Sequence, residues 1–225
     1  MLKIPRHDQV LKEILRSLYT SREVGSALGF KGGTSLYLFY DLDRFSVDLD
    51  FNLLSKDFDP SIITKIISKH LTILDESNKY NTWFWLGSYE KNLPKIKVEI
   101  SKRDYPDRYV SQDFYGLTLP TLAPDCMFAH KLAAITDRKS LQNRDLYDAH
   151  FMFTHNFPIN ENIIKLRTNQ TTKEYFKTLI KFVEQNVSEK NILTGLGELL
   201  SESQKDHVKA TLKRDLLFDL KSRLK

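Results

Sequence analysis

Residues 30–53, FKGGTSLYLFYDLDRFSVDLDFNL, contain the pattern that decides the fold. The Gly-Gly-Thr-Ser turn at residues 32–35 leads into a short apolar helix. Residues 44–53 are then expected to form a strand, because polar and apolar side chains alternate there as they do in half-buried strands. Side chains two positions apart in a strand point to the same face. The polar face is therefore expected to carry Arg44, Ser46, Asp48 and Asp50.

The two aspartates of this face suggest a metal site. Asp48 and Asp50 would repel each other on an open strand face, unless a divalent cation neutralised them. Mg²⁺ prefers oxygen ligands and is commonly held by one or two carboxylates together with substrate phosphates. Backbone amides at a glycine-rich helix start can closely approach an anion. A solvated strand face and an ordinary turn would each explain one motif alone, but their combination predicts a site for metal and phosphate.

A second group of charged residues follows downstream. Lys131 falls on an expected helix, where it is either a surface lysine with a buried stem or a phosphate ligand. Asp145 and Asp148 are three positions apart, so they share a helix face. They could pair with Lys131, Arg138 or Arg144 and hold these cations beside phosphates.

The remaining elements are expected from apolar periodicity and from the prolines that interrupt it. Helices are expected over residues 7–24, 34–40, 60–74, 126–139 and 204–224, and further strands over residues 83–86 and 96–100. In the last of these strands Glu99 is a third carboxylate, and it shares the polar face with Lys95 and Lys97. A surface of lysine and glutamate is the competing interpretation of that face.

Composition and charge limit the kind of partner. The chain has 225 residues and a formal net charge of +5, enough for one large domain or a domain with a helical appendage. Residues 161–225 carry 13 Lys and Arg against 9 Asp and Glu. A basic region beside an acidic metal site suits a polyanionic partner, although a solvated helix surface would have the same composition. Candidate contacts near one face of the last helix are Lys205, Lys209, Lys213 and Arg214.

The sequence also indicates a cytoplasmic location. It has no run of eighteen apolar residues that would cross a membrane, so no membrane partner is expected. The N-terminus is charged and lacks an apolar signal core. The single cysteine, Cys126, excludes an internal disulfide and fits a reducing compartment.

The motifs at residues 32–36, 44–50, 130–138 and 144–148 resemble those of the AbiEii/AbiGii toxin family, within the polymerase-β-type nucleotidyltransferase superfamily. The resemblance covers residues 25–153. It implies an α+β fold with a small mixed sheet flanked by helices, followed by a mostly helical C-terminal half. The nucleotidyltransferase domain would comprise residues 1–157, and residues 158–225 would form a helical region.

The same resemblance implies roles for the residues. Two Mg²⁺ ions would be held by Asp48 and Asp50 with Glu99, the last matching a third acid of the superfamily. Lys131 would neutralise the pyrophosphate leaving group, and one of Asp145 and Asp148 would match a functional aspartate. The phosphates of the NTP would be cradled by Gly32, Gly33, Thr34 and Ser35, with help from Arg44 and Ser46.

The function implied by the resemblance is transfer of NMP from an NTP to an RNA acceptor, expected to be the 3′ end of tRNA. The protein would be the toxin of a type IV toxin–antitoxin or abortive-infection system, with its antitoxin encoded by the adjacent gene. One alternative keeps the chemistry but uses a small molecule or a protein hydroxyl as acceptor. Another is an inactive module that binds nucleotide or RNA, against which the intact Asp48, Asp50 and Lys131 argue.

Overall fold

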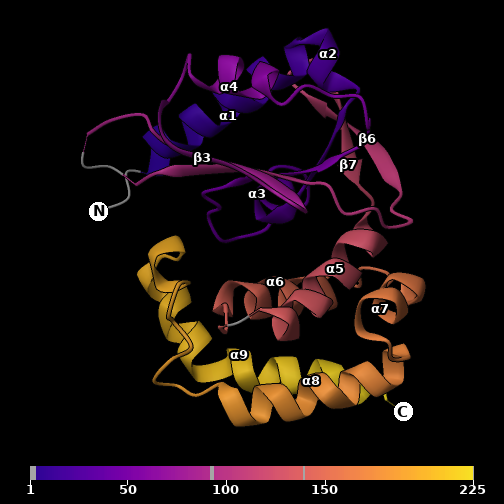
Figure 1. The fold of residues 1–225 in the computed structure, drawn as a ribbon. Coiled ribbons are helices and arrows are strands. Elements are labelled where there is room, and N and C mark those ends of the chain that lie inside the picture. Colours follow the sequence, from indigo (N-terminus) through magenta and orange to yellow (C-terminus); the bar gives the residue numbers. More distant parts are fainter. Residues whose placement is uncertain (1–3, 92–93, 139, 225) are drawn as a thin grey trace. The chain divides into compact units, whose positions relative to one another are not determined.

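The computed structural model describes residues 4–91, 94–138 and 140–224. The chain forms two compact units, Met1–Leu122 and Ala123–Lys225, called here the first and second unit (Figure 1). The domain boundary predicted after residue 157 lies within the second unit and stays a prediction. No helix in the described part of the chain is long and apolar enough to cross a membrane.

The first unit is built around a mixed seven-stranded sheet in the order β3-β4-β5-β2-β1-β7-β6. Two neighbouring pairs, β2 with β5 and β1 with β7, are parallel, and the other pairs are antiparallel. The expected mixed sheet is therefore confirmed. Its strands are β1 (Leu28–Lys31), β2 (Leu49–Leu53), β3 (Thr72–Lys79), β4 (Thr82–Ser88), β5 (Ile96–Ser101), β6 (Tyr109–Phe114) and β7 (Leu117–Leu122).

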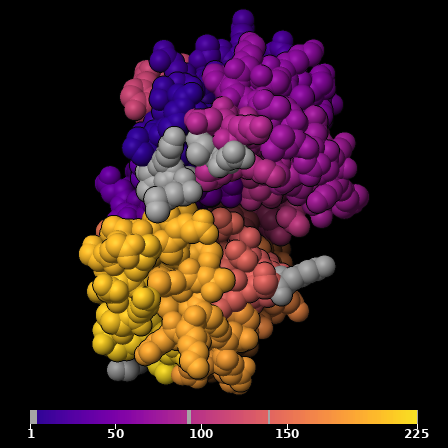
Figure 2. All heavy atoms as spheres, turned by 90° about the vertical axis from the view of Figure 1, so that its left-hand side faces the viewer, coloured from indigo at the N-terminus to yellow at the C-terminus, as the bar shows by residue number. Residues whose placement is uncertain are grey.

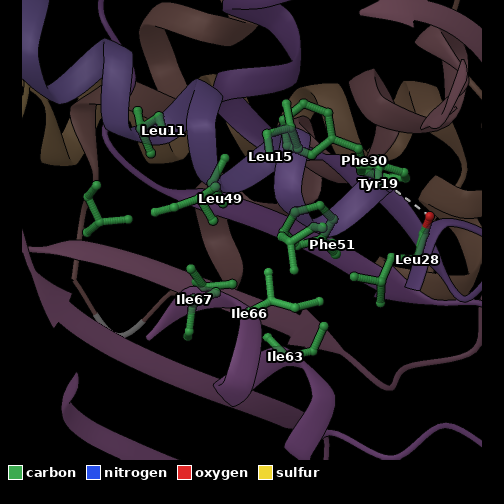
Figure 3. Packing of buried hydrophobic residues seen from close by; sticks show 14 of the residues in the cluster. Leu11, Leu15, Tyr19, Leu28, Phe30, Leu49, Phe51, Ile63, Ile66 and Ile67 are labelled. Atoms are coloured by element: carbon green, nitrogen blue, oxygen red, sulfur yellow. Dashed lines mark hydrogen bonds between the residues drawn. The ribbon is translucent and has the colours of Figure 1, made fainter. Parts of the chain in front are cut away.

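The helices beside this sheet are α1 (Ile4–Thr20), α2 (Arg22–Gly25), α3 (Gly32–Phe39) and α4 (Ser61–Ile67). Figure 1 shows α1, α2 and α4 on one side of the sheet and α3 on the other. The apolar side of α1 packs with α4 and with the strands in one buried cluster, which includes Leu11, Leu15, Phe51 and Ile67 (Figure 3). The hydroxyl of Tyr19 closes one edge of this cluster by donating to the carbonyl oxygen of Leu28 at 3.0 Å.

The second unit is helical, as expected for the C-terminal half. The long helix α9 buries Val208, Leu212, Leu216 and Leu220, spaced four apart, against α6 and α8. The α-helices of the second unit are α5 (Pro124–Asp137), α6 (Asn143–Thr154), α7 (Glu161–Thr168), α8 (Thr172–Asn186) and α9 (Glu202–Ser222). Capping boxes at Thr171 and Ser201 fix the starts of α8 and α9 by satisfying backbone amides that have no partner within the helix.

The acidic strand is shorter than the sequence predicts. It begins at Leu49, not at residue 44, and both Arg44 and Phe45 are buried. The expected separation of residues 44–48 into a polar and an apolar face is therefore wrong. The reason lies in the pairing: the last residue of β1, Lys31, pairs with Asp50, and beyond it the chain has already turned into α3. Residues 44–48 consequently have no β1 neighbour and pack against the start of α3.

Candidate active site

The carboxylates of the first unit meet on two neighbouring strands. Asp50 on β2 is in register with Glu99 on β5, and Asp48 immediately precedes β2. In-register residues of paired strands project to the same face of the sheet, so Asp50 and Glu99 share one face. Within the described residues no group of three or more His, Cys, Asp or Glu side chains is arranged to hold a metal ion. The assignment of Glu99 as a third ligand therefore stays a prediction.

A lysine lies between two of these acids. The Nζ atom of Lys97 is 3.4 Å from Asp48 Oδ2 and 3.9 Å from Glu99 Oε2. The side chains of Lys97 and Asp48 are 25% and 18% exposed, so solvent screens this contact only partly. The sequence placed Lys97 on the polar face of its strand but gave no reason to assign it a role. The contact arises because β5 pairs with β2 in parallel, which an alternating pattern cannot reveal.

The first turn of α3, which contains Gly32 and Gly33, packs against residues 44–50, called here the acidic segment. Helix α3 begins at Gly32, whose φ of 88° lies in the left-handed region. A Cβ atom at Gly32 would lie 2.5 Å from Asp50 Oδ2, which is far too close. A Cβ atom at Gly33 would lie 2.9 Å from both Arg44 Nη2 and Ser46 Oγ. Gly32 therefore requires glycine and packs against the predicted metal ligand Asp50, whereas a side chain at Gly33 would have to displace Arg44 or Ser46.

Polar side chains connect the start of α3 with the acidic segment. The hydroxyl of Thr34 makes hydrogen-bond contacts with Ser46 Oγ at 2.9 Å and with the backbone carbonyl oxygen of Asp48. Arg44 is only 2% exposed and donates from Nη1 to the carbonyl oxygen of Phe45 at 2.9 Å. The buried Ser35 hydroxyl has no hydrogen-bond partner among the described residues. Of the residues predicted to bind the nucleotide, Gly32, Gly33, Thr34, Arg44 and Ser46 are brought together around the start of α3.

His7 is a supporting residue that the sequence did not indicate. It comes from α1, is fully buried, and its Nε2 lies 3.0 Å from the carbonyl oxygen of Val47, next to Asp48. Its Nδ1 lies 3.1 Å from the hydroxyl of Tyr89. Burial lowers the pKa of His7, although the Val47 carbonyl and the Asp48 charge act in the opposite direction. The neutral ring fits these contacts, with Nε2–H donating to Val47 and Nδ1 accepting from Tyr89.

The second unit holds its own charged cluster. Lys131 Nζ lies 2.6 Å from Asp148 Oδ2 and 3.7 Å from Asp145 Oδ1. The Nε atom of Arg138 is 2.7 Å from Asp145 Oδ2, but it is not aligned as a hydrogen bond. Asp145 and Asp148 are almost completely buried. Of the three cations considered as partners of these aspartates, Lys131 and Arg138 lie beside them, and buried carboxylates need such counter-charges.

The basic residues of α9 are mostly engaged with the protein itself. Lys205 pairs with Glu202 at 2.7 Å, and Arg214 pairs with Asp215 at 2.9 Å. Lys213 donates to the backbone carbonyl oxygens of Glu184 and Val187, at 3.1 and 2.6 Å, where α8 ends. The exposed Lys209 lines a groove of about 350 Å³ together with Lys213 and Arg214. Orange and yellow residues, those of the C-terminal helices, form much of the second unit's surface in Figure 2.

Solved structures resemble the whole chain. One is the crystal structure of a candidate nucleotidyltransferase from Helicobacter pylori, with a TM-score of 0.59 and 19% identity, covering 98% of this chain and 97% of that one. Another is JHP933 from Helicobacter pylori, with a TM-score of 0.58 and 19% identity, covering 99% of this chain and 96% of that one. At this level of identity the likeness shows a shared fold.

The search of curated proteins gives no significant match. A family model does match, and its description is "Nucleotidyl transferase AbiEii toxin, Type IV TA system". The matched segment, residues 13–221, includes both the acidic segment of the first unit and the Lys131 cluster of the second. The chain therefore belongs to the AbiEii toxin family of nucleotidyltransferases of type IV toxin–antitoxin systems.

Proposed function

We propose that this nucleotidyltransferase uses Asp48 and Asp50 to hold Mg²⁺ and transfers NMP from an NTP to an RNA acceptor, the 3′ end of tRNA. The observation that carries the proposal is the close packing of Gly32 on Asp50, where a Cβ atom would lie 2.5 Å from the carboxylate. Such packing joins a helix start, which favours anions, to carboxylates, which favour hard cations. A nucleoside triphosphate bound with its metal needs both a site for anions and a site for cations.

The residues present fit the divalent cation that the family implies. Asp48 and Asp50 supply hard oxygen donors, and Glu99 lies in register on the neighbouring strand. Bound in pairs, Mg²⁺ ions stabilise the entering and leaving oxygens of an in-line displacement. The two carboxylates would hold the metal, and the backbone amides of residues 32–35, in the first turn of α3, would bind the phosphates. The buried Ser35 hydroxyl, which has no partner within the described residues, is a further donor at the helix start.

Lys131 belongs to the same proposal through its charge. We propose that Lys131 stabilises the negative charge that develops on the leaving pyrophosphate, because a preorganised cation lowers the energy of such a transition state. Asp145 and Asp148 would position its ammonium group, since both lie within 4 Å of it. Both carboxylates are almost completely buried, so Lys131 held by them would need little reorganisation during the reaction.

The proposed acceptor is RNA, which we expect to contact the exposed Lys209 in the groove that this residue lines with Lys213 and Arg214. Phosphate contacts by Lys and Arg are the main source of affinity in such complexes. Because tRNA and NTPs meet in the cytoplasm, we expect the reaction there. The family belongs to toxin–antitoxin systems, and we expect the antitoxin gene to lie beside this one.

The test is incubation of the full-length protein with each radiolabelled NTP, Mg²⁺ and total tRNA. Label on RNA is expected with the wild-type protein and with Asp113→Asn, which neutralises an exposed acid on β6 as a matched control. Asp48→Asn and Asp50→Asn should each reduce labelling by several orders of magnitude with little change in melting temperature. Near-normal transfer by Asp48→Asn would disprove the assignment of the metal site.

The same experiment separates the alternative functions. Label on protein would indicate a hydroxyl of a polypeptide as the acceptor. Label on an added small molecule, with none on RNA, would indicate that class of acceptor instead. No label under any condition, together with retained NTP binding, would indicate an inactive binding module.

A further inference from the structure

Lys97 gives the acidic site a positive charge of its own. Its ammonium group lies 3.4 Å from Asp48 and 3.9 Å from Glu99, so it bridges the segment before β2 and the strand β5. The carboxylate repulsion that suggested a metal is therefore already reduced in the chain itself. A divalent cation approaching Asp48 therefore encounters a carboxylate that is already paired with Lys97, and the positive charge of Lys97 repels it.

The backbone holds Lys97 firmly at this position. Strand β5 lies inside the sheet between β4 and β2, and Lys97 pairs with Leu86 of β4. Its neighbours Ile96 and Val98 are fully buried. The lysine can therefore leave Asp48 only by rotating its side chain, while its Cα atom stays beside the site. Such a side chain can exchange one anionic partner for another nearby.

We propose that Lys97 pairs with Asp48 and Glu99 in the metal-free enzyme, competes there with the divalent cation, and turns to the nucleotide phosphates when both bind. The inference rests on the proposed function, because it takes Asp48 as a metal ligand. Competition makes the metal bind weakly when no nucleotide is present. Nucleotide then supplies the displaced ammonium group with a new partner, so metal and nucleotide strengthen each other's binding by the same factor.

The experiment measures Mn²⁺ binding to the full-length protein by calorimetry and by electron paramagnetic resonance. Without nucleotide, Lys97→Gln is expected to bind Mn²⁺ about three- to tenfold more tightly than the wild type, because a positive charge close to the metal is removed. Lys97→Arg keeps the charge and should keep the wild-type affinity. Lys95→Gln makes the same change two residues earlier and should also leave the affinity unchanged.

A second measurement adds a non-hydrolysable NTP analogue. The analogue should increase Mn²⁺ affinity strongly in the wild type and less in Lys97→Gln, because the variant has no ammonium group to transfer to the phosphates. If Lys97→Gln does not fold, as judged by its melting temperature, Lys97→Met provides the same charge removal with a more lipophilic side chain.

The outcomes distinguish this inference from the proposed function. Wild-type Mn²⁺ binding that is lost in Asp48→Asn but unchanged or weakened by removal of the Lys97 charge would overturn the inference and leave the metal site intact. If the wild type binds no Mn²⁺ with or without the analogue, and Lys97→Gln binds none either, both the metal site and the role of Lys97 are wrong.

Discussion

Two glycines of the first unit share a left-handed backbone conformation but have different surroundings. Gly32 has a φ of 88° and Gly116 a φ of 80°. A Cβ atom at Gly116 would have no neighbour within 4 Å, whereas one at Gly32 would collide with the Asp50 carboxylate. Comparing the same substitution at both sites separates backbone strain from crowding of the acidic site.

Gly32→Ala is therefore expected to destabilise the protein more than Gly116→Ala. The strain of alanine in this conformation costs about 1–2 kcal/mol in either variant. Gly32→Ala must in addition displace Asp50 or the helix start, so it should also weaken Mn²⁺ and NTP binding. Urea unfolding gives the two stabilities, and calorimetry gives the affinities. Equal losses of stability, with unchanged affinities, would show that Asp50 moves away at no cost.

His7 makes the stability of the first unit depend on pH. Its pKa in the folded protein is lowered from 6.5 by burial, so below that pH the unfolded chain binds a proton that the folded chain does not. The free energy of unfolding should then fall as the pH falls below 6.5, by at most about 1.4 kcal/mol for each pH unit. Above pH 6.5 both states are neutral at His7, and this contribution disappears.

The measurement is the unfolding free energy at about pH 7.5 and about pH 5.5 in three proteins. His7→Gln should show a smaller difference between the two pH values than the wild type, even if its stability is lower at both. His207→Gln, at an exposed position of α9, should show the wild-type difference. A wild-type pH dependence in His7→Gln would mean that other groups cause the acid sensitivity.

At the scale of the elements, we expect the basic residues of α9 to differ in their contributions to stability and to RNA binding. Lys213 binds the last carbonyls of α8, where a cation also interacts well with the helix dipole. Lys213→Gln should therefore destabilise the protein by about 1–2 kcal/mol. Lys209→Gln should leave stability unchanged but weaken RNA binding and reduce its salt dependence by about one unit of slope.

RNA affinity measured over a series of salt concentrations tests this division, with Lys56→Gln in the first unit as a control for the loss of one exposed charge. An unchanged salt slope in Lys209→Gln would move the acceptor surface away from α9. It would also leave the positive charge of the C-terminal region as an ordinary solvated surface.

The elements also show where sequence periodicity stops being informative. The helix expected over residues 60–74 ends at Ile67, and the chain enters strand β3 at Thr72. Apolar residues recur through both elements, at positions 62, 63, 66, 67, 71, 73 and 74, so the pattern does not mark the boundary. The boundary depends on the pairing of β3 with β4, which is a tertiary contact. Strands β6 and β7 were not predicted for the same reason. By contrast, the buried face of α1 was predicted, since its apolar spacing alone determines it.

The candidate site shows the same limit. Motif spacing was sufficient to predict that the acidic residues and the two glycines lie together, because they are close in sequence. The roles of Asp48 and Asp50 as metal ligands stay predictions. Periodicity was sufficient to place Asp145 and Asp148 on one face of a helix, but it left Lys131, Arg138 and Arg144 open as their partners. The packing of α5 on α6 brings Lys131 to both aspartates. The contacts of Lys97 and His7 with the acidic segment depend on strand order and on helix packing. No local pattern contains that information.

At the scale of the whole molecule, the proposed reaction needs residues from both compact units. The predicted metal ligands belong to the first unit and Lys131 to the second. If this division of tasks is right, Lys131→Met should abolish transfer but leave Mn²⁺ binding by the Asp48 site intact. Asp50→Asn should abolish both. These two readouts, measured on the full-length protein, separate a defect in chemistry from a defect in metal binding.

Loss of Lys131 also removes the ammonium group beside the buried carboxylates of Asp145 and Asp148, which costs about 3–5 kcal/mol and by itself reduces activity. The double variant Lys131→Met/Asp148→Asn removes this complication, because it also neutralises Asp148, the carboxylate 2.6 Å from the ammonium group. It should recover much of the lost stability in urea unfolding and remain inactive, because no ammonium group is left to stabilise the pyrophosphate. Recovery of transfer together with stability would show that Lys131 serves only to neutralise Asp148, and the proposed leaving-group role would then be wrong.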